Sequence, residues 1–134
     1  MALFGGCLCG AIRFEATADP LWVTHCHCSM CRKTSGAAFS TWVSVPADKL
    51  RFVKGKPTRF PSSREARRGF CSVCGSSLTM QYVGTPDVTD VALGSLDDPA
   101  AVTPSRHIWT ESRLPWVHTD DLPSHGRGPN EDAA

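Results

Sequence analysis

Seven cysteines, gathered in three short groups, constrain the fold of this chain more than any other feature. The groups are Cys7 with Cys9, then Cys26, Cys28 and Cys31, and then Cys71 with Cys74. Two thiolates in a tight turn can grip one zinc ion, because the short loop brings both sulfurs within about 2.3 Å of the metal. Gly10 and Gly75 each follow a pair, and glycine accepts the positive φ that such a turn requires. The pattern therefore predicts zinc sites rather than disulfides, to which an odd number of cysteines is also poorly suited.

The grouping further predicts how the cysteines are shared between two ions. Joining the first and last groups gives a closed site of Cys7, Cys9, Cys71 and Cys74, which would tie the N-terminal strand to a distant hairpin. The remaining ligands, Cys26, Cys28 and Cys31, leave one position of a tetrahedral zinc vacant, as in catalytic sites. We therefore expect two Zn²⁺ per chain, one structural and one catalytic.

Other assignments of the same residues remain open on spacing alone. Cys28 and Cys31 could pair with Cys71 and Cys74 as a zinc ribbon, but this would leave three cysteines unused. His25 or His27 could complete the three-cysteine site, although buried strand histidines are the plainer interpretation. A redox dithiol at Cys71 and Cys74 is disfavoured, because no βαβ pattern surrounds it.

Composition limits the function classes. A chain of 134 residues fits a single domain. Its 14 Lys and Arg against 13 Asp and Glu give a net charge of +1, which argues against nucleic-acid binding and against an anionic membrane surface. No stretch approaches the roughly 20 apolar residues of a membrane span. The N-terminus lacks the basic region and apolar run of a secretory signal, so we expect a cytoplasmic protein.

Short segments with strand character dominate the chain and predict a mostly β, antiparallel domain. Those segments are 11–16, 21–25, 39–45, 50–53, 58–60, 68–70, 78–83 and 88–93. Alternation in 11–16 and 39–45 predicts half-buried strands. One short helix is expected over 29–34, with Ser29 as N-cap and Gly36 as its end. We place the domain at 1–123 and a polar, Gly/Pro-rich tail at 124–134.

Longer motifs resemble one known family, the glutathione-dependent formaldehyde-activating enzymes, also called the centromere protein V/GFA domain family. The similar segments are Gly6 to Phe14, Cys26 to Lys33, Ser35 to Phe39, Gly69 to Ser76, Leu96 to Pro99, Arg106 to Trp109, Pro115-Trp116 and Asp121 to Pro123. The resemblance implies the Mss4-like fold of antiparallel sheets. It also implies a structural zinc on the four outer cysteines and a catalytic zinc on Cys26, Cys28 and Cys31. Methionine-R-sulfoxide reductases also pair zinc cysteines, but they need a C-terminal nucleophilic cysteine, and none follows Cys74.

The same resemblance implies a carbon–sulfur lyase activity that joins glutathione and formaldehyde into S-hydroxymethylglutathione, or cleaves it. Three thiolates give the zinc site a net charge of −1, which favours binding a thiol over activating water. The alternative is a zinc-stabilised binding module without turnover, since a fold does not define an activity. The sequence carries no signal for an oligomeric state.

Cations near the cysteines could hold the two carboxylates of glutathione. Arg32 and Lys33 are the first candidates, because they directly follow Cys31, and the others are Arg64, Arg67, Arg68 and Arg106. His107 could orient a ligand or shuttle a proton. The tryptophans are expected mainly in the core: Trp22, Trp42, Trp109 and Trp116.

Overall fold

The computed structural model describes residues 1–128, which form two β-sheets and one short α-helix. The strands are β1 (Leu3–Gly6), β2 (Arg13–Ala16), β3 (Trp22–Cys26), β4 (Ser40–Pro46), β5 (Leu50–Lys54), β6 (Thr58–Pro61), β7 (Ala66–Phe70), β8 (Ser77–Tyr82), β9 (Val88–Ala92) and β10 (Arg106–Ile108). The helix is α1 (Ser29–Ser35), and the 3₁₀ turns are η1 (Ala47–Lys49), η2 (Leu93–Ser95), η3 (Pro99–Ala101) and η4 (Thr110–Ser112). The mostly β class predicted from the sequence is confirmed.

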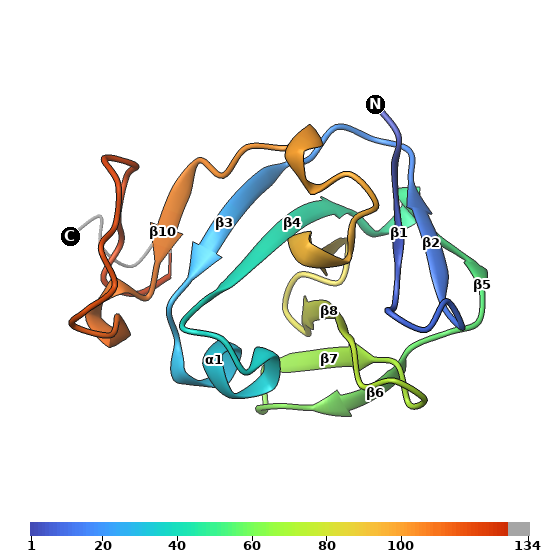
Figure 1. The fold of residues 1–134 in the computed structure, drawn as a ribbon, viewed down its shortest axis with the longest axis horizontal. Helices are drawn as coiled ribbons and strands as arrows, with labels where there is room; N and C mark the ends of the chain where they lie inside the picture. Colours follow the sequence, from blue (N-terminus) through green and yellow to red (C-terminus); the bar gives the residue numbers. More distant parts are fainter. Residues whose placement is uncertain (129–134) are drawn as a thin grey trace.

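The two sheets differ in size and order. The smaller has the order β1-β2-β5, and the larger has the order β10-β3-β4-β9-β8-β7-β6. Figure 1 shows the small sheet beside the large one, with α1 below β4 and near β7. Thirteen buried residues from both sheets and their connections, among them Phe14, Val43 and Val91, form one apolar cluster at this junction. The main core therefore lies where the two sheets meet.

Two strands were not expected from the sequence. β1 contains two glycines, and Gly5 is required there because a Cβ would come within 2.4 Å of the Ser95 carbonyl oxygen. β10 is only three residues long and pairs in parallel with β3, so it departs from the antiparallel arrangement predicted. Both lie at the margins of sheets, where short strands with weak apolar alternation are stabilised by pairing rather than by their own pattern.

Strand β4 corrects the expectation of a half-buried strand. Its residues from Trp42 to Val45 are all buried, because β4 lies inside the large sheet between β3 and β9. Val43 and Val45 face the main core, whereas Trp42 packs with the second apolar cluster around Cys26 and Cys31. Two of the predicted core tryptophans are also misplaced: Trp22 and Trp116 are exposed, at 48% and 66%.

The helix begins one residue earlier than a Ser29 cap would place it. Cys28 is the N-cap, with extended φ and ψ, and its sulfur accepts a hydrogen bond from the Cys31 N–H at 3.3 Å. Ser29 is the first helical residue, so its prediction as the cap is wrong. Gly36 ends the helix as predicted, in the left-handed conformation at φ 69°. The cap is a sulfur instead of the usual side-chain oxygen, and the same Cys28 sulfur belongs to the three-cysteine cluster.

The C-terminal segment follows β10. The His125 N–H donates to the His107 carbonyl oxygen, and the Glu111 N–H donates to that of Gly126. Residues 124–127 therefore pack along the 107–111 segment, while 129–134, most of the predicted tail, lie outside the described residues. Among residues 1–128, no helix is long and apolar enough to cross a membrane.

Candidate metal centres

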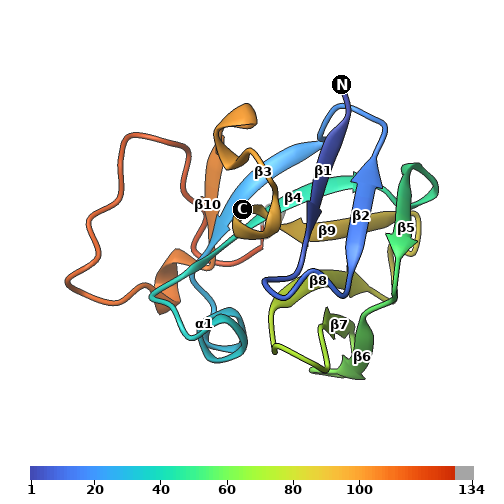
Figure 2. The ribbon, with the colours of Figure 1, turned by 45° about the vertical axis from the view of Figure 1, so that its right-hand side comes forward.

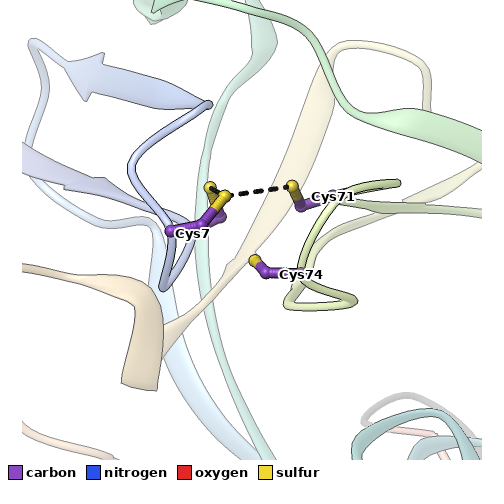
Figure 3. Close-up of side chains that lie close together, drawn as sticks. Cys7, Cys71 and Cys74 are labelled. Carbon is purple, nitrogen blue, oxygen red and sulfur yellow. Dashed lines mark hydrogen bonds between the residues drawn. The ribbon is translucent and has the colours of Figure 1, made fainter.

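The four-cysteine cluster, Cys7, Cys9, Cys71 and Cys74, joins two turns that are distant in the sequence. One turn links β1 to β2, and the other links β7 to β8. Figure 3 shows Cys7 on the first turn facing Cys71 and Cys74 on the second. Their four sulfurs lie within 4.8 Å of one another. The cluster therefore lies between the small sheet and the large one, where a bound ion would connect them.

Sulfur spacing in this cluster matches the edges of a zinc tetrahedron. Zn–S bonds of about 2.3 Å place neighbouring sulfurs about 3.8 Å apart. The Cys7 and Cys9 sulfurs are separated by 3.6 Å, and those of Cys9 and Cys71 by 3.9 Å. The Ile12 N–H donates to the Cys7 sulfur at 3.2 Å. The Ser76 hydroxyl at 3.1 Å is the main cause that lowers the pKa of Cys74 to about 5.

Both turns use glycine at the predicted positions. Gly10 and Gly75 have φ of 81° and 78°, values that side chains rarely adopt. Each N–H closes its turn: that of Gly10 on the Cys7 carbonyl oxygen, and that of Gly75 on the Cys71 carbonyl oxygen. Backbone hydrogen bonds and glycine conformation therefore both contribute to the shape of the two turns.

The three-cysteine cluster comes from one continuous segment. Cys26 ends β3, Cys28 caps α1, and Cys31 lies in its first turn. Their sulfurs lie within 4.8 Å of one another, and those of Cys26 and Cys31 are 3.4 Å apart. Cys26 and Cys31 are buried, and Cys28 is half-buried. Three convergent sulfurs fit three corners of a zinc tetrahedron and leave the fourth corner to another ligand.

Charge in the three-cysteine cluster concentrates on Cys28. Hydrogen bonds from the Cys26 and Cys31 thiols, helped by the Cys31 N–H, lower the pKa of Cys28 to about 2. The same contacts, together with burial, raise the pKa of Cys26. These contacts favour the thiolate form of Cys28, the form that binds zinc.

Arg68 is buried directly against this cluster, although the sequence marked it as a binder of substrate carboxylates. Its guanidinium nitrogens Nη1 and Nη2 both lie 3.6 Å from the Cys31 sulfur. It also donates from Nε to the Ser62 hydroxyl at 2.9 Å and stacks over Trp42 at 5.9 Å. A residue held in this way is part of the cysteine site, so a role for Arg68 in holding a carboxylate is not supported.

The two predicted alternative histidine ligands face away from the cysteines. His27 Nε2 lies 3.0 Å from His107 Nδ1, and His25 Nδ1 lies 2.8 Å from the Thr41 hydroxyl. His107 Nε2 in turn reaches Asp120 at 2.9 Å. One proton assignment satisfies this chain: His27 donates to His107, which donates to the Asp120 carboxylate. His25 joins His107 and Asp120 by stacking on the His107 ring, with ring centroids 4.8 Å apart, and neither His25 nor His27 completes the three-cysteine cluster.

Acid should weaken the fold through His27. The side chain is fully buried, and burial, followed by the charge of His107, lowers its pKa to about 4. An unfolded histidine titrates near 6.5, so between about pH 6.5 and pH 4 the unfolded state binds more protons than the folded state. The free energy of unfolding therefore decreases as the pH is lowered through this range. From pH 7 to pH 5 we expect a loss of about 2 kcal/mol from this group. Urea unfolding of zinc-loaded wild type and His27→Gln at both pH values measures it, and equal losses in the two proteins would contradict it.

The first-choice cations for substrate carboxylates differ in availability. Arg32 donates from Nη1 to the carbonyl oxygens of His27 and Ser112, at 2.8 and 2.7 Å, so part of its guanidinium holds the backbone. Lys33 is exposed. Arg67 donates to backbone carbonyl oxygens of its own turn, and Arg106 stacks over Trp22 at 5.0 Å. A substrate-binding role for Arg32 and Lys33 remains a prediction.

A groove of about 670 Å³ lies beside the four-cysteine cluster, where Cys7 lines it. Its walls are the turn at Cys7 and Leu8, residues 39–42, and residues 92–97. Trp42 lines the groove and also packs with Cys26 and Cys31. The indole N–H of Trp42 has no hydrogen-bond partner among the described residues. The groove has the volume of a small-molecule site, and Trp42 separates it from the three-cysteine cluster, none of whose cysteines lines it.

The positions of the sulfurs favour one of the predicted zinc assignments over the other. The seven cysteines gather as four and three, and all are free of disulfides. Within residues 1–128, Cys28 and Cys31 do not gather with Cys71 and Cys74, so the zinc-ribbon pairing is not supported. All-sulfur tetrahedral sites fit zinc or iron–sulfur chemistry. The identity of the ions, and the structural and catalytic roles of the ligands, remain predictions.

The fold and the two clusters define a β-sheet protein with two cysteine metal centres. The family model of the glutathione-dependent formaldehyde-activating enzyme matches residues 2–112. The chain therefore belongs to that family, as its motifs predicted.

Relatives agree with this assignment. A Halomonas elongata protein named putative glutathione-dependent formaldehyde-activating enzyme is 30% identical, with 90% of this chain and 82% of that protein covered. An uncharacterized lyase of Schizosaccharomyces pombe is 32% identical over 58% of this chain and 56% of that protein. A crystal structure of a Rhodobacter sphaeroides protein has the same fold, with a TM-score of 0.57, 23% identity, and coverage of 92% of this chain and 99% of that one.

Proposed function

We propose that this protein is a zinc-dependent carbon–sulfur lyase that forms or cleaves S-hydroxymethylglutathione or a related adduct of a thiol and a small aldehyde. The observation that carries the proposal is the three-cysteine cluster, whose sulfurs converge and leave one tetrahedral position for a ligand. Membership of the family and the lyase name of one relative support the reaction class. We place the activity in the cytoplasm, where glutathione is abundant.

Zinc held by Cys26, Cys28 and Cys31 would have one open position, at which it would either bind the substrate sulfur as a thiolate or polarise the aldehyde. The protein's own groups position the reactants. The N-terminal turn of α1 holds Cys28 and Cys31, and the Cys31 carbonyl oxygen is held by the hydroxyls of Ser35 and Ser40, at 2.7 and 3.0 Å. Such contacts fix the sulfurs in place, which lowers the reorganisation needed when a ligand arrives.

The groove lined by Trp42 fits a peptide-sized thiol. Its volume of about 670 Å³ lies within the range of roughly 300–1,000 Å³ of small-molecule sites. Arg32 and Lys33, which follow Cys31, are the proposed contacts for the glutathione carboxylates. Lys33 is free to reach outward from α1, whereas Arg32 can contribute only the nitrogens that do not hold backbone.

Exchange NMR tests the activity directly. With glutathione and formaldehyde at equilibrium, the exchange rate between free and adduct signals should rise in proportion to protein concentration above the spontaneous rate. A rate no greater than that of buffer would reject this substrate pair. Retained zinc at both clusters, together with no exchange, would favour the alternative of a zinc-stabilised binding module. A panel of other thiols then separates a glutathione-specific enzyme from one that accepts small thiols generally.

A further inference from the structure

Arg68 on β7 is only 4% exposed, and the carboxylate of Asp90 on β9 attracts it through space without forming an ion pair among residues 1–128. Within residues 1–128, no ion pair joins its guanidinium to an aspartate or glutamate. A buried charge is costly unless an opposite charge or several hydrogen bonds compensate for it. The nearest group able to carry negative charge among its contacts is the Cys31 sulfur, which both terminal nitrogens approach at 3.6 Å.

The guanidinium is held in this orientation from three sides. Nε donates to the Ser62 hydroxyl at 2.9 Å, and Nη1 reaches the Thr34 hydroxyl at 3.3 Å. The guanidinium carbon, Cζ, lies over the buried Trp42 ring, 5.9 Å from its centroid. Because Thr34 lies on α1 and Trp42 on β4, the contacts join β7 to both elements that surround the cluster. In Figure 1 and Figure 2, α1 and β7 both lie at the lower side of the molecule, and the contact between Arg68 and Thr34 connects them.

We infer that Arg68 is the residue that lets the three-cysteine site accept a fourth, negatively charged ligand. Zinc with three thiolates has a net charge of −1, and an incoming thiolate would make it −2. A permanent positive charge beside Cys31 returns the occupied site to −1, and an arginine cannot lose its proton to escape the burial. Arg68 thus acts through the cysteine ligands as a positioning residue. The inference concerns ligand choice at the open position of the proposed enzyme, and it does not require turnover.

Cobalt substitution measures that choice without any aldehyde. Cobalt-loaded protein is titrated at fixed pH with 2-mercaptoethanol, an anionic ligand once bound, and separately with neutral imidazole, and the change in the visible and near-ultraviolet bands reports binding. For Arg68→Met we expect at least ten-fold weaker thiol binding, or about 1.4 kcal/mol, with imidazole binding within two-fold of wild type. Arg68→Lys should recover most of the thiol affinity. The control is Arg67→Met, which removes the neighbouring half-buried arginine whose contacts are backbone carbonyl oxygens.

Thiol affinity of Arg68→Met within two-fold of wild type would overturn the inference. Equal losses of thiol affinity and imidazole affinity in Arg68→Met would indicate a purely structural role and would also overturn it. A wild type that does not bind the thiol would overturn it as well. If Arg68→Met fails to hold cobalt at the three-cysteine cluster, Arg68→Gln replaces it, since it keeps hydrogen-bond donors without the charge. A wild type that binds thiol through Arg68 but catalyses no exchange with formaldehyde would leave this inference standing and reject the proposed function.

Discussion

Cys71→Ser is expected to unfold the domain or to lower its free energy of unfolding by at least about 4 kcal/mol, because metal binding at a closed site is coupled to folding. Cys71 is 1% exposed and belongs to the cluster that joins the β1–β2 turn to the β7–β8 turn. A domain of this size has only about 5–15 kcal/mol of stability, so the loss removes much of it. Thermal and urea unfolding followed by circular dichroism measure the effect, with zinc content determined on the same samples.

Val73→Ala is the matched control for that experiment. Val73 lies in the same turn as Cys71 but is 76% exposed, so its truncation should change stability by less than about 0.5 kcal/mol. A Cys71→Ser protein as stable as Val73→Ala, and still holding all of its zinc, would show that the four-cysteine cluster does not hold the fold together.

Cys28→Ala should keep the fold yet reduce glutathione–formaldehyde exchange to the spontaneous rate, a loss of at least about 100-fold in the catalysed component. Cys28 is the half-buried member of the three-cysteine cluster, and its removal leaves only two of the three proposed zinc ligands. The variant also loses the helix N-cap contact with the Cys31 N–H, which costs about 1 kcal/mol. Exchange NMR measures the rate, and urea unfolding measures the cap.

Cys28→Ser separates these two effects. Serine is a good N-cap, so this variant should recover the stability lost in Cys28→Ala while remaining without catalysis. Exchange by Cys28→Ala equal to that of wild type would reject the catalytic role of the three-cysteine cluster for this substrate. Recovery of exchange by Cys28→Ser would show that helix capping, rather than metal ligation, is what Cys28 contributes.

Local patterns predicted most of the fold. Eight strands and the helix lie within about two residues of their expected positions, because each has its own alternation and its own Gly, Pro or Asp breakers. β1 and β10 escaped prediction because their stability comes from partners: Gly5 fits only against the Ser95 carbonyl oxygen, and β10 is defined by parallel pairing with β3. The burial of both faces of β4 depends on its place inside the sheet, which no short window of sequence encodes.

The grouping of the cysteines could be predicted from their spacing, but the residues that surround the clusters could not. Short loops bring Cys26, Cys28 and Cys31 together almost regardless of the fold, so their grouping is a local property. Arg68 reaches Cys31 across 37 positions of sequence, and His107 reaches His27 across 80. Only the pairing of distant strands creates those contacts. The one sequence signal for the Arg68 contact was its position just before Phe70 and Cys71. That signal could not be interpreted without knowing which face of β7 carries Arg68.

The most direct test of the division into four and three cysteines is the zinc content of wild-type protein, measured together with cysteine alkylation. Protein purified without chelators and freed of loosely bound metal is expected to contain two zinc ions per chain, with all seven cysteines protected from alkylation. Cys28→Ala should retain one ion and should expose Cys26 and Cys31 to alkylation. A wild type with one zinc ion per chain, and with Cys26, Cys28 and Cys31 freely alkylated, would contradict the account.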